Sequence, residues 1–260
     1  MVSAYHLAMT RARVGDFRPS VHGLHFQNAW PPGPTLRFGS IDLRRLGIGD
    51  ASQGLCGGMC FVVGDLWAAG VLPPDDRQPP PFDSPRFLRI VHRQVESLDW
   101  FRLPAALWLR AIRPDDRPPQ RAGAAEAGPP APPESPLAAI LRRLGVAPLG
   151  RLTLERDWPR VRRTIDAGRL AMLSLVRQRS LNPWALATNH QVVAYGYVAT
   201  VEEIRIAVYD PNHPDRDDVE LVIEIAPDGR TPRLRQTTGE PLRGFVLTRY
   251  RPEPPGSWRP

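Results

Sequence analysis

The spacing of apolar residues separates a helical first part of the chain from an extended second part. In the first part, apolar residues recur at helical intervals, which predicts one helix over residues 56–70 and a long helical stretch over residues 85–112. Pro104 lies within the long stretch, and because proline removes a backbone donor we expect a bend or a break there. Shorter helices are predicted over residues 137–144 and 158–165.

After residue 169 the period changes from helical to extended. Short apolar or alternating runs, separated by Asn, Asp, Gly and Pro, predict strands over residues 170–176, 191–197, 204–209, 219–225 and 245–250. Consecutive short strands of this kind favour an antiparallel sheet. Because the helices come first and the strands second, the sequence predicts an α+β fold with the helices packed on one face of the sheet.

Three segments lack either period. Residues 1–50 are rich in turn-forming residues and are expected to form an irregular N-terminal arm with one short strand near Leu36. Residues 114–136 are rich in proline and alanine, which predicts a flexible loop, and the proline-rich residues 252–260 are expected to form an extended tail. We therefore expect one domain over residues 1–260, interrupted by that loop.

Charge argues against a nucleic-acid partner. The net charge is +7, and all of the 34 positively charged residues are arginines, because the sequence has no lysine. The arginines are spread along the chain, whereas a nucleic-acid groove needs a clustered basic footprint. The densest run, Arg160, Arg162 and Arg163, falls on the predicted helix over residues 158–165, and we interpret it as the solvated face of that helix.

The two cysteines and the lack of long apolar runs define the expected environment. Cys56 and Cys60 are too few for a disulfide framework, and their spacing places them on one helix face, so reduced thiols are expected. A Cys-x3-Cys spacing without a second matching pair also argues against a zinc site. No run of about 20 apolar residues and no secretory core occurs, which predicts no membrane span and a cytoplasmic location.

Cys56 is the candidate nucleophile because it lies where a tight turn meets a helix. The N-terminus of a helix supplies partial positive charge and free backbone N–H groups, which favour a thiolate and can also stabilise an oxyanion. Gly57 and Gly58 are expected to let a substrate carbonyl approach the backbone. The alternative is a small cysteine buried in a helical core, which is the interpretation we prefer for Cys60.

His190 and Asp210 are the candidate partners of Cys56. His190 opens the predicted strand over residues 191–197, and Asp210 ends the next strand. If the two strands form a hairpin through residues 199–202, both side chains fall at the same end of the sheet, where the carboxylate can hold the imidazole tautomer that takes the thiol proton. Asp210 can also be a turn former before proline, and Asn212 is a rival for the orienting role.

The remaining candidates are weaker. His22, His25 and Trp30 can line a cleft or simply pack against the domain, and His213 is a candidate rim residue. The glycines after Cys56 form neither a phosphate loop nor a dinucleotide-binding pattern, so no cofactor and no metal are implied.

Three segments together resemble the papain-like cysteine peptidases. They are the Cys-Gly-Gly-Met opening of an apolar helix, the strand that begins with His190 and the Tyr-Asp-Pro sequence at Asp210. The resemblance is closest to the bacteriocin-processing double-glycine peptidases. It implies a papain-like fold with Cys56 as nucleophile, His190 as general base and acid, and Asp210 as the orienting group. The chain also resembles bacterial and fungal proteins that share its Gly-Leu-Cys-Gly-Gly-Met and Asn-His-Gln-Val segments, which implies a fold but no substrate.

This chain departs from the pattern of those peptidases upstream of the cysteine. In those peptidases a glutamine upstream of the cysteine donates to the oxyanion, but here Asp50 stands near the equivalent position, and an ionised carboxylate cannot donate. Gln53 and Asn189 are the candidate substitutes. Aligning Cys60 as the nucleophile instead requires an extra residue after Gln53, so we prefer Cys56.

The sequence thus predicts a thiol-dependent hydrolase that acts on a peptide or another amide bond through an acyl-enzyme. An acyltransferase would use the same residues with a different acceptor. A binding or effector module that keeps the fold without turnover is the rival hypothesis, favoured by the missing upstream glutamine. Neither the substrate beyond this class nor the oligomeric state follows from the sequence.

Overall fold

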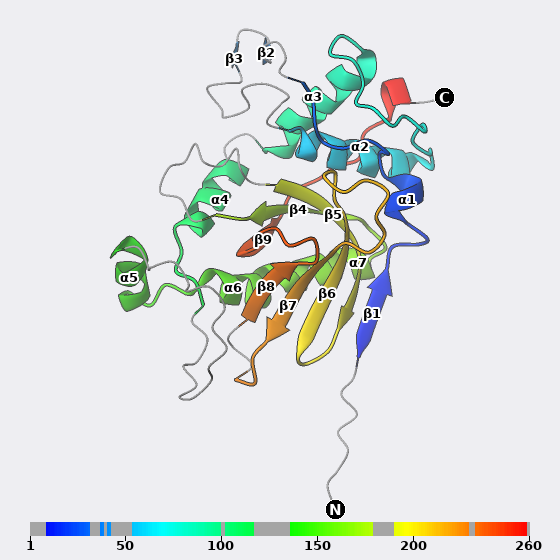
Figure 1. The fold of residues 1–260 in the computed structure, drawn as a ribbon. Coiled ribbons are helices and arrows are strands. Elements are labelled where there is room, and N and C mark those ends of the chain that lie inside the picture. Colours follow the sequence, from blue (N-terminus) through cyan, green and yellow to red (C-terminus); the bar gives the residue numbers. More distant parts are fainter. Residues whose placement is uncertain are drawn as a thin grey trace, which may run out of the picture.

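A curled antiparallel sheet lies at the centre of the molecule, with helices packed around it (Figure 1). This computed structural model describes residues 9–31, 37–38, 41–42, 54–99, 102–116, 136–178, 190–228 and 232–258. Over these residues the fold is α+β, which confirms the predicted class.

The helices follow the apolar pattern of the sequence. Their bounds are α1 Pro19–His22, α2 Cys56–Ala69, α3 Pro85–Ser97, α4 Arg102–Ala111, α5 Pro136–Arg143, α6 Leu149–Leu152 and α7 Trp158–Asp166, with a π-helical turn, η3, over Thr153–Asp157. Helix α2 ends at Gly70 in the left-handed region, with φ of 65°, a conformation that glycine adopts without steric cost. The predicted helices over residues 56–70, 137–144 and 158–165 are therefore confirmed.

The long helical stretch breaks at a different place from the one expected. Helix α3 ends at Ser97 and α4 begins at Arg102, so the break precedes Pro104. Pro104 falls in the first turn of α4, where its missing N–H has no intrahelical partner to lose. The proline thus marks the start of a second helix and not a kink within one.

The main sheet contains the five predicted strands and two more. Its order is β8 (Pro232–Gln236), β7 (Glu220–Ile225), β6 (Glu203–Tyr209), β5 (His190–Ala199), β4 (Ala171–Val176) and β9 (Gly244–Leu247), and all neighbours are antiparallel. Strand β5 is long enough to pair with β4 over its first half and with β1 (Thr10–Arg13) over its last residues. Strand β5 is buried at nearly every position, so both of its faces are covered. The sequence predicted helices on one face of the sheet only.

The N-terminal arm is more regular than expected. Its first described segment contributes β1 to the sheet, and Phe17 is fully buried beside Trp67 of α2. The short strand expected near Leu36 is present as β2 (Arg37–Phe38), which pairs with β3 (Ile41–Asp42). The arm is thus held to the domain by backbone pairing that its turn-rich sequence does not reveal.

The predicted loop and tail also differ in part from expectation. At the start of the loop, Pro114 accepts a hydrogen bond from the Leu149 N–H over 3.0 Å, and helix α5 already begins at Pro136. Residues 117–135 lie outside the described residues. The tail forms a short 3₁₀ helix, η5 (Gly256–Trp258), and Trp258 is buried with the Arg86 guanidinium over its ring. The tail therefore packs on the domain and is not simply extended.

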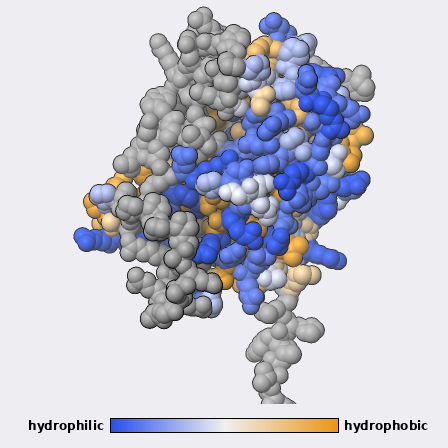
Figure 2. Space-filling view, in the orientation of Figure 1, coloured by the Kyte–Doolittle hydropathy of each residue, from blue (hydrophilic) through white to orange (hydrophobic). Residues whose placement is uncertain are grey.

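The visible outer face of the described residues is mainly hydrophilic, with hydrophobic residues scattered over it (Figure 2). On helix α7, Arg160 and Arg163 are exposed, as the sequence predicts. Among the described residues, no helix combines the length and the apolar character that crossing a membrane requires.

Candidate active site

The fold brings Cys56, His190 and Asp210 together from three elements. Cys56 is the first residue of α2, His190 is the first residue of β5, and Asp210 directly follows β6. Strands β5 and β6 form the expected hairpin, with Val193 opposite Tyr209. This register places His190 and Asp210 at one end of the sheet, where His190 Nε2 lies 2.6 Å from Asp210 Oδ1.

The Cys56 thiol lies beside the imidazole of His190, and each group shifts the pKa of the other. Because Nε2 of the ring faces Asp210, Nδ1 is the nitrogen left for the sulfur. Burial raises the pKa of Cys56, but the hydrogen bond and charge of His190, with the Gln191 N–H, outweigh burial and leave this pKa below its ordinary value. The arrangement therefore favours a thiolate.

The charges of His190 and Asp210 support that state. Burial lowers the pKa of His190, but hydrogen bonds to Asp210 and Cys56 outweigh burial and raise it to about 9. Burial also raises the pKa of Asp210, yet its contacts with His190 and the neighbouring donors bring it below the ordinary range. The shifts of all three groups thus favour their charged states, a thiolate beside an imidazolium and a carboxylate.

Asp210 has both of the roles that its sequence position suggests. Its Oδ1 accepts the backbone N–H of Asn212 over 2.8 Å, which closes the turn after β6, and the same oxygen faces His190. Oδ2 accepts from the side-chain amide of Gln236 over 2.7 Å. The Asn212 side chain instead accepts from Asn28, so it is not the group that orients the imidazole.

Cys60 lies one turn behind Cys56 and is a structural thiol. It is fully buried, and its Sγ donates to the backbone carbonyl of Gln191 over 3.3 Å. Burial, with the nearby charges of Cys56 and Asp210, raises the pKa of Cys60 well above its ordinary value. Gln191 therefore contacts both cysteines through its backbone, with its N–H toward Cys56 and its carbonyl toward Cys60.

The two glycines after Cys56 allow close packing of the helix that begins there. A Cβ on Gly57 would lie 2.2 Å from Ser97 Oγ and 2.8 Å from Gln191 Nε2. A Cβ on Gly58 would lie 2.1 Å from the backbone oxygen of Ile90. Both residues are buried, and neighbouring groups fill the space beside each Cα. The expected approach of a substrate carbonyl to this backbone stays a prediction. The two glycines allow α2 to pack closely against α3 and β5.

Replacing Gly58 with alanine is expected to destabilise the protein by about 1–3 kcal/mol. Alanine normally stabilises a helix interior by about 1 kcal/mol relative to glycine, but here its methyl group meets the Ile90 carbonyl, which belongs to a helix backbone and cannot rotate away. The measurement is urea unfolding. Ala68→Gly, at an exposed position of the same helix, gives the effect of propensity alone. A Gly58→Ala variant as stable as the natural sequence would contradict the close packing.

Two backbone donors at the start of α2 have no acceptor among the described residues. The Gly58 N–H donates to Gln94 Oε1 over 2.8 Å, and the Met59 N–H donates to the Leu55 carbonyl. In the described part of the chain, the N–H groups of Cys56 and Gly57 have no hydrogen-bond acceptor. An N–H on the candidate nucleophile itself, at the positive end of a helix, is suited to an oxyanion. The side-chain donors expected from the sequence, Gln53 and Asn189, lie outside the described residues.

Asn28 links the cysteine turn to the aspartate turn. Its Oδ1 accepts the Leu55 N–H over 2.6 Å, and its Nδ2 donates to Asn212 Oδ1 over 3.2 Å. Its own N–H donates to the Pro211 carbonyl. Asn28 thus fixes the residue before Cys56 against the residues after Asp210, and a single asparagine in a turn-rich arm gives no sequence signal of that role.

His22 and His25 of the arm take part in packing. His22 contacts the rings of Phe17 and Trp67, with ring centroids 5.5 and 4.9 Å away. His25 is buried, and its Nδ1 lies 2.5 Å from Asp215. These contacts favour packing over the lining of a cleft.

Trp30 and His213 do not join Cys56 either. Trp30 is buried and packs edge-to-face against Phe26 and Phe87. His213 is partly exposed near the Asp210 turn and pairs with Glu240 over 2.6 Å, which agrees with a position at the rim. The geometry thus separates the three central residues from the weaker candidates.

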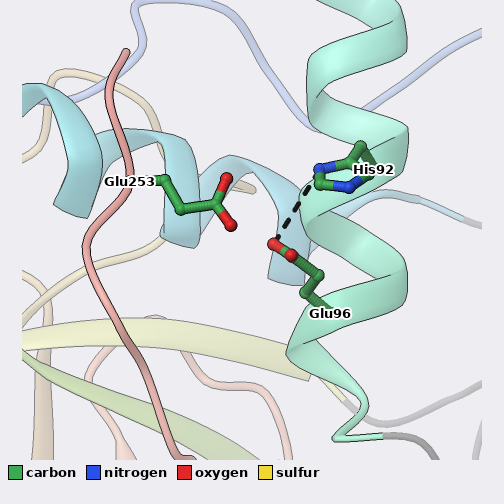
Figure 3. Close-up of side chains that lie close together, drawn as sticks. All are labelled: His92, Glu96 and Glu253. Carbon is green, nitrogen blue, oxygen red and sulfur yellow. Dashed lines mark ion pairs between the residues drawn. The ribbon is translucent and has the colours of Figure 1, made fainter.

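Among the described residues, one group has the composition of a metal site, and it consists of His92, Glu96 and Glu253 (Figure 3). His92 and Glu96 come from α3 and face Glu253 on the C-terminal segment. Both carboxylates already contact arginine, Glu96 with Arg93 and Glu253 with Arg89 and Arg93. These contacts describe an ion-pair network in which arginine supplies the positive charge that a metal ion would bring.

Comparison with known proteins adds no relative. No protein-family model matches the chain, and no curated protein or solved structure is significantly similar to it.

Proposed function

We propose that the protein is a papain-like, thiol-dependent hydrolase that acts on a peptide or another amide bond. The observation that carries this proposal is the buried series Cys56, His190 and Asp210, with the cysteine at the N-terminus of a helix. A nucleophile, a base that contacts it and a third group that orients the base are the three parts that acyl transfer to a side chain requires.

The proposed reaction has two halves. The Cys56 thiolate attacks the substrate carbonyl carbon, and the N–H of Cys56 stabilises the oxyanion. The bond to the leaving nitrogen breaks as imidazolium Nδ1 of His190 gives that nitrogen its proton, which leaves a thioester on Cys56. The neutral imidazole then takes a proton from water, and the hydroxyl attacks the thioester. The carbon–sulfur bond breaks, the acid is released, and the thiolate–imidazolium pair is restored.

A reactive acyl ester tests this proposal without knowledge of the substrate. On incubation with p-nitrophenyl acetate, Cys56 is expected to carry an acetyl group, detected by mass spectrometry of peptides after an acid quench. Cys60→Ser should retain this labelling, and Cys56→Ala should lose it. Addition of a simple amine distinguishes hydrolysis from transfer, because an acyltransferase yields the amide. Acetylation at Cys60, or at neither cysteine, would support the binding-module alternative instead.

A further inference from the structure

Asp210 is held from its far side by a residue that the three-residue arrangement does not include. Gln236, at the end of β8, is buried, and its Nε2 donates to Asp210 Oδ2 over 2.7 Å. On the other side of the same amide, Oε1 accepts from Nη2 of Arg177, which directly follows β4, over 3.3 Å. The carboxamide therefore bridges a guanidinium and the carboxylate of Asp210.

This bridge requires the curl of the sheet. Strands β4 and β8 are separated by β5, β6 and β7, a distance of about 19 Å in a flat sheet at the usual strand spacing. The curl brings the end of β8 toward the end of β4, so that Gln236 meets Arg177 beside Asp210.

The chemistry of the three groups fixes how the amide lies. Arginine can only donate, and an ionised aspartate can only accept. A carboxamide between them can hydrogen-bond to both groups in one orientation only, with its oxygen toward Arg177 and its nitrogen toward Asp210. A glutamate at this position would place a second negative charge against Asp210, so the glutamine is suited to a carboxylate that stays ionised.

We infer that Gln236, oriented by Arg177, is a positioning residue that holds the Asp210 carboxylate in line with His190. This inference rests on the proposed function of the Cys56 site. With Oδ2 satisfied by Gln236, Oδ1 is left to face His190 Nε2. A buried carboxylate oxygen that loses its donor must rotate or take up a proton to be satisfied. Either change weakens the charge-assisted bond that stabilises the imidazolium, and with it the thiolate of Cys56.

The test measures the pKa of Cys56 from the ultraviolet absorbance of its thiolate as the pH is raised. The absorbance of a matching protein that also carries Cys56→Ser is subtracted at each pH. This measurement needs no substrate and no access for a reagent. In Gln236→Leu, which keeps the volume but removes both hydrogen bonds, the pKa of Cys56 is expected to rise by about one unit. The His190 Nε2–H proton resonance should also move upfield or exchange rapidly with water. A loss of packing alone would lower the melting temperature without moving either signal.

Two further variants complete the design. Arg177→Leu removes the donor that orients the amide, and it is expected to shift the titration in the same direction by a smaller amount. Arg235→Gln is the matched control on β8, because its exposed side chain pairs with Glu224, and its titration should equal that of the natural sequence.

The outcomes separate this inference from the function on which it rests. If folded Gln236→Leu titrates like the natural sequence, the inference is wrong, and if that variant does not fold, an unshifted Arg177→Leu overturns it. If Cys56 titrates as an ordinary thiol in the natural sequence itself, the proposed function fails first.

Discussion

Replacing His190 with alanine is expected to abolish the thiolate of Cys56 at neutral pH. The hydrogen bond and charge of His190 are what bring the pKa of this buried thiol below its ordinary value, and without them burial alone raises it. The alkylation rate of Cys56 at neutral pH should therefore fall by about two orders of magnitude or more. Hydrolysis of any substrate should fall by about 10³-fold or more, because the variant also loses its general acid and base.

The measurement is the rate of iodoacetamide labelling of each cysteine against pH, with circular dichroism to confirm that the variant is folded. His213→Ala is the matched control, since that histidine also contacts a carboxylate but lies at the rim and not beside Cys56. It should leave the profile of Cys56 unchanged. A folded His190→Ala protein with unchanged labelling of Cys56 would remove the basis of the proposed catalytic pair.

The same shifts set the expected pH dependence of hydrolysis. The reactive state needs Cys56 deprotonated and His190 protonated. Activity should therefore appear as pH rises through the lowered pKa of Cys56 and should decline again as His190 loses its proton at about pH 9. An alkaline limit near the ordinary histidine value of about 6.5 would show that Asp210 and Cys56 do not stabilise the imidazolium.

Replacing Asp65 with alanine is expected to destabilise the protein by about 3–5 kcal/mol. Asp65 lies on α2 with its side chain 1% exposed, and it accepts from Arg93 over 2.9 Å and from Arg89 over 3.0 Å. It also accepts from the Tyr250 hydroxyl and the Glu253 N–H, both on the C-terminal segment. Removing the carboxylate leaves the guanidinium of Arg93, itself 3% exposed, without its buried partner.

The expected loss of stability comes from breaking this network. The intact ion pairs themselves add little net stability. Burial raises the pKa of Asp65, and the contacts with Glu253, Arg93, Tyr250 and Arg89 offset that cost only in part. A buried ion pair of this kind contributes little over apolar packing, yet loss of one partner is costly because the other stays in a medium that solvates it poorly.

Urea unfolding measures the effect. Glu155→Ala is the matched control, because Glu155 pairs with Arg151 over 2.8 Å on an exposed helix surface, where an ion pair contributes less than about 1 kcal/mol. A change of similar size in both variants would contradict the role assigned to burial. An Asp65→Ala protein with unchanged stability would mean that solvent reaches Arg93 in the folded state.

The local pattern of the sequence determined the elements that carry the site. The apolar run after the turn placed Cys56 at the start of a helix, and the alternating runs placed His190 and Asp210 at the ends of paired strands. These predictions succeeded because helix starts and hairpin registers depend on residues that are near one another in the chain. Strand β8 was missed, since it has one apolar residue, Leu234, flanked by arginines.

The tertiary structure alone decided what surrounds the three central residues. Strand β1 joins the sheet through backbone pairing with β5, which lies more than 180 residues away and depends little on side-chain pattern. Asn28 and Gln236 reach the site only because the arm wraps over the cysteine turn and the sheet curls. A polar residue acquires such a role from the groups it meets across the fold. The sequence therefore determined which residues are candidates for the reaction, and long-range packing decided which neighbours hold them.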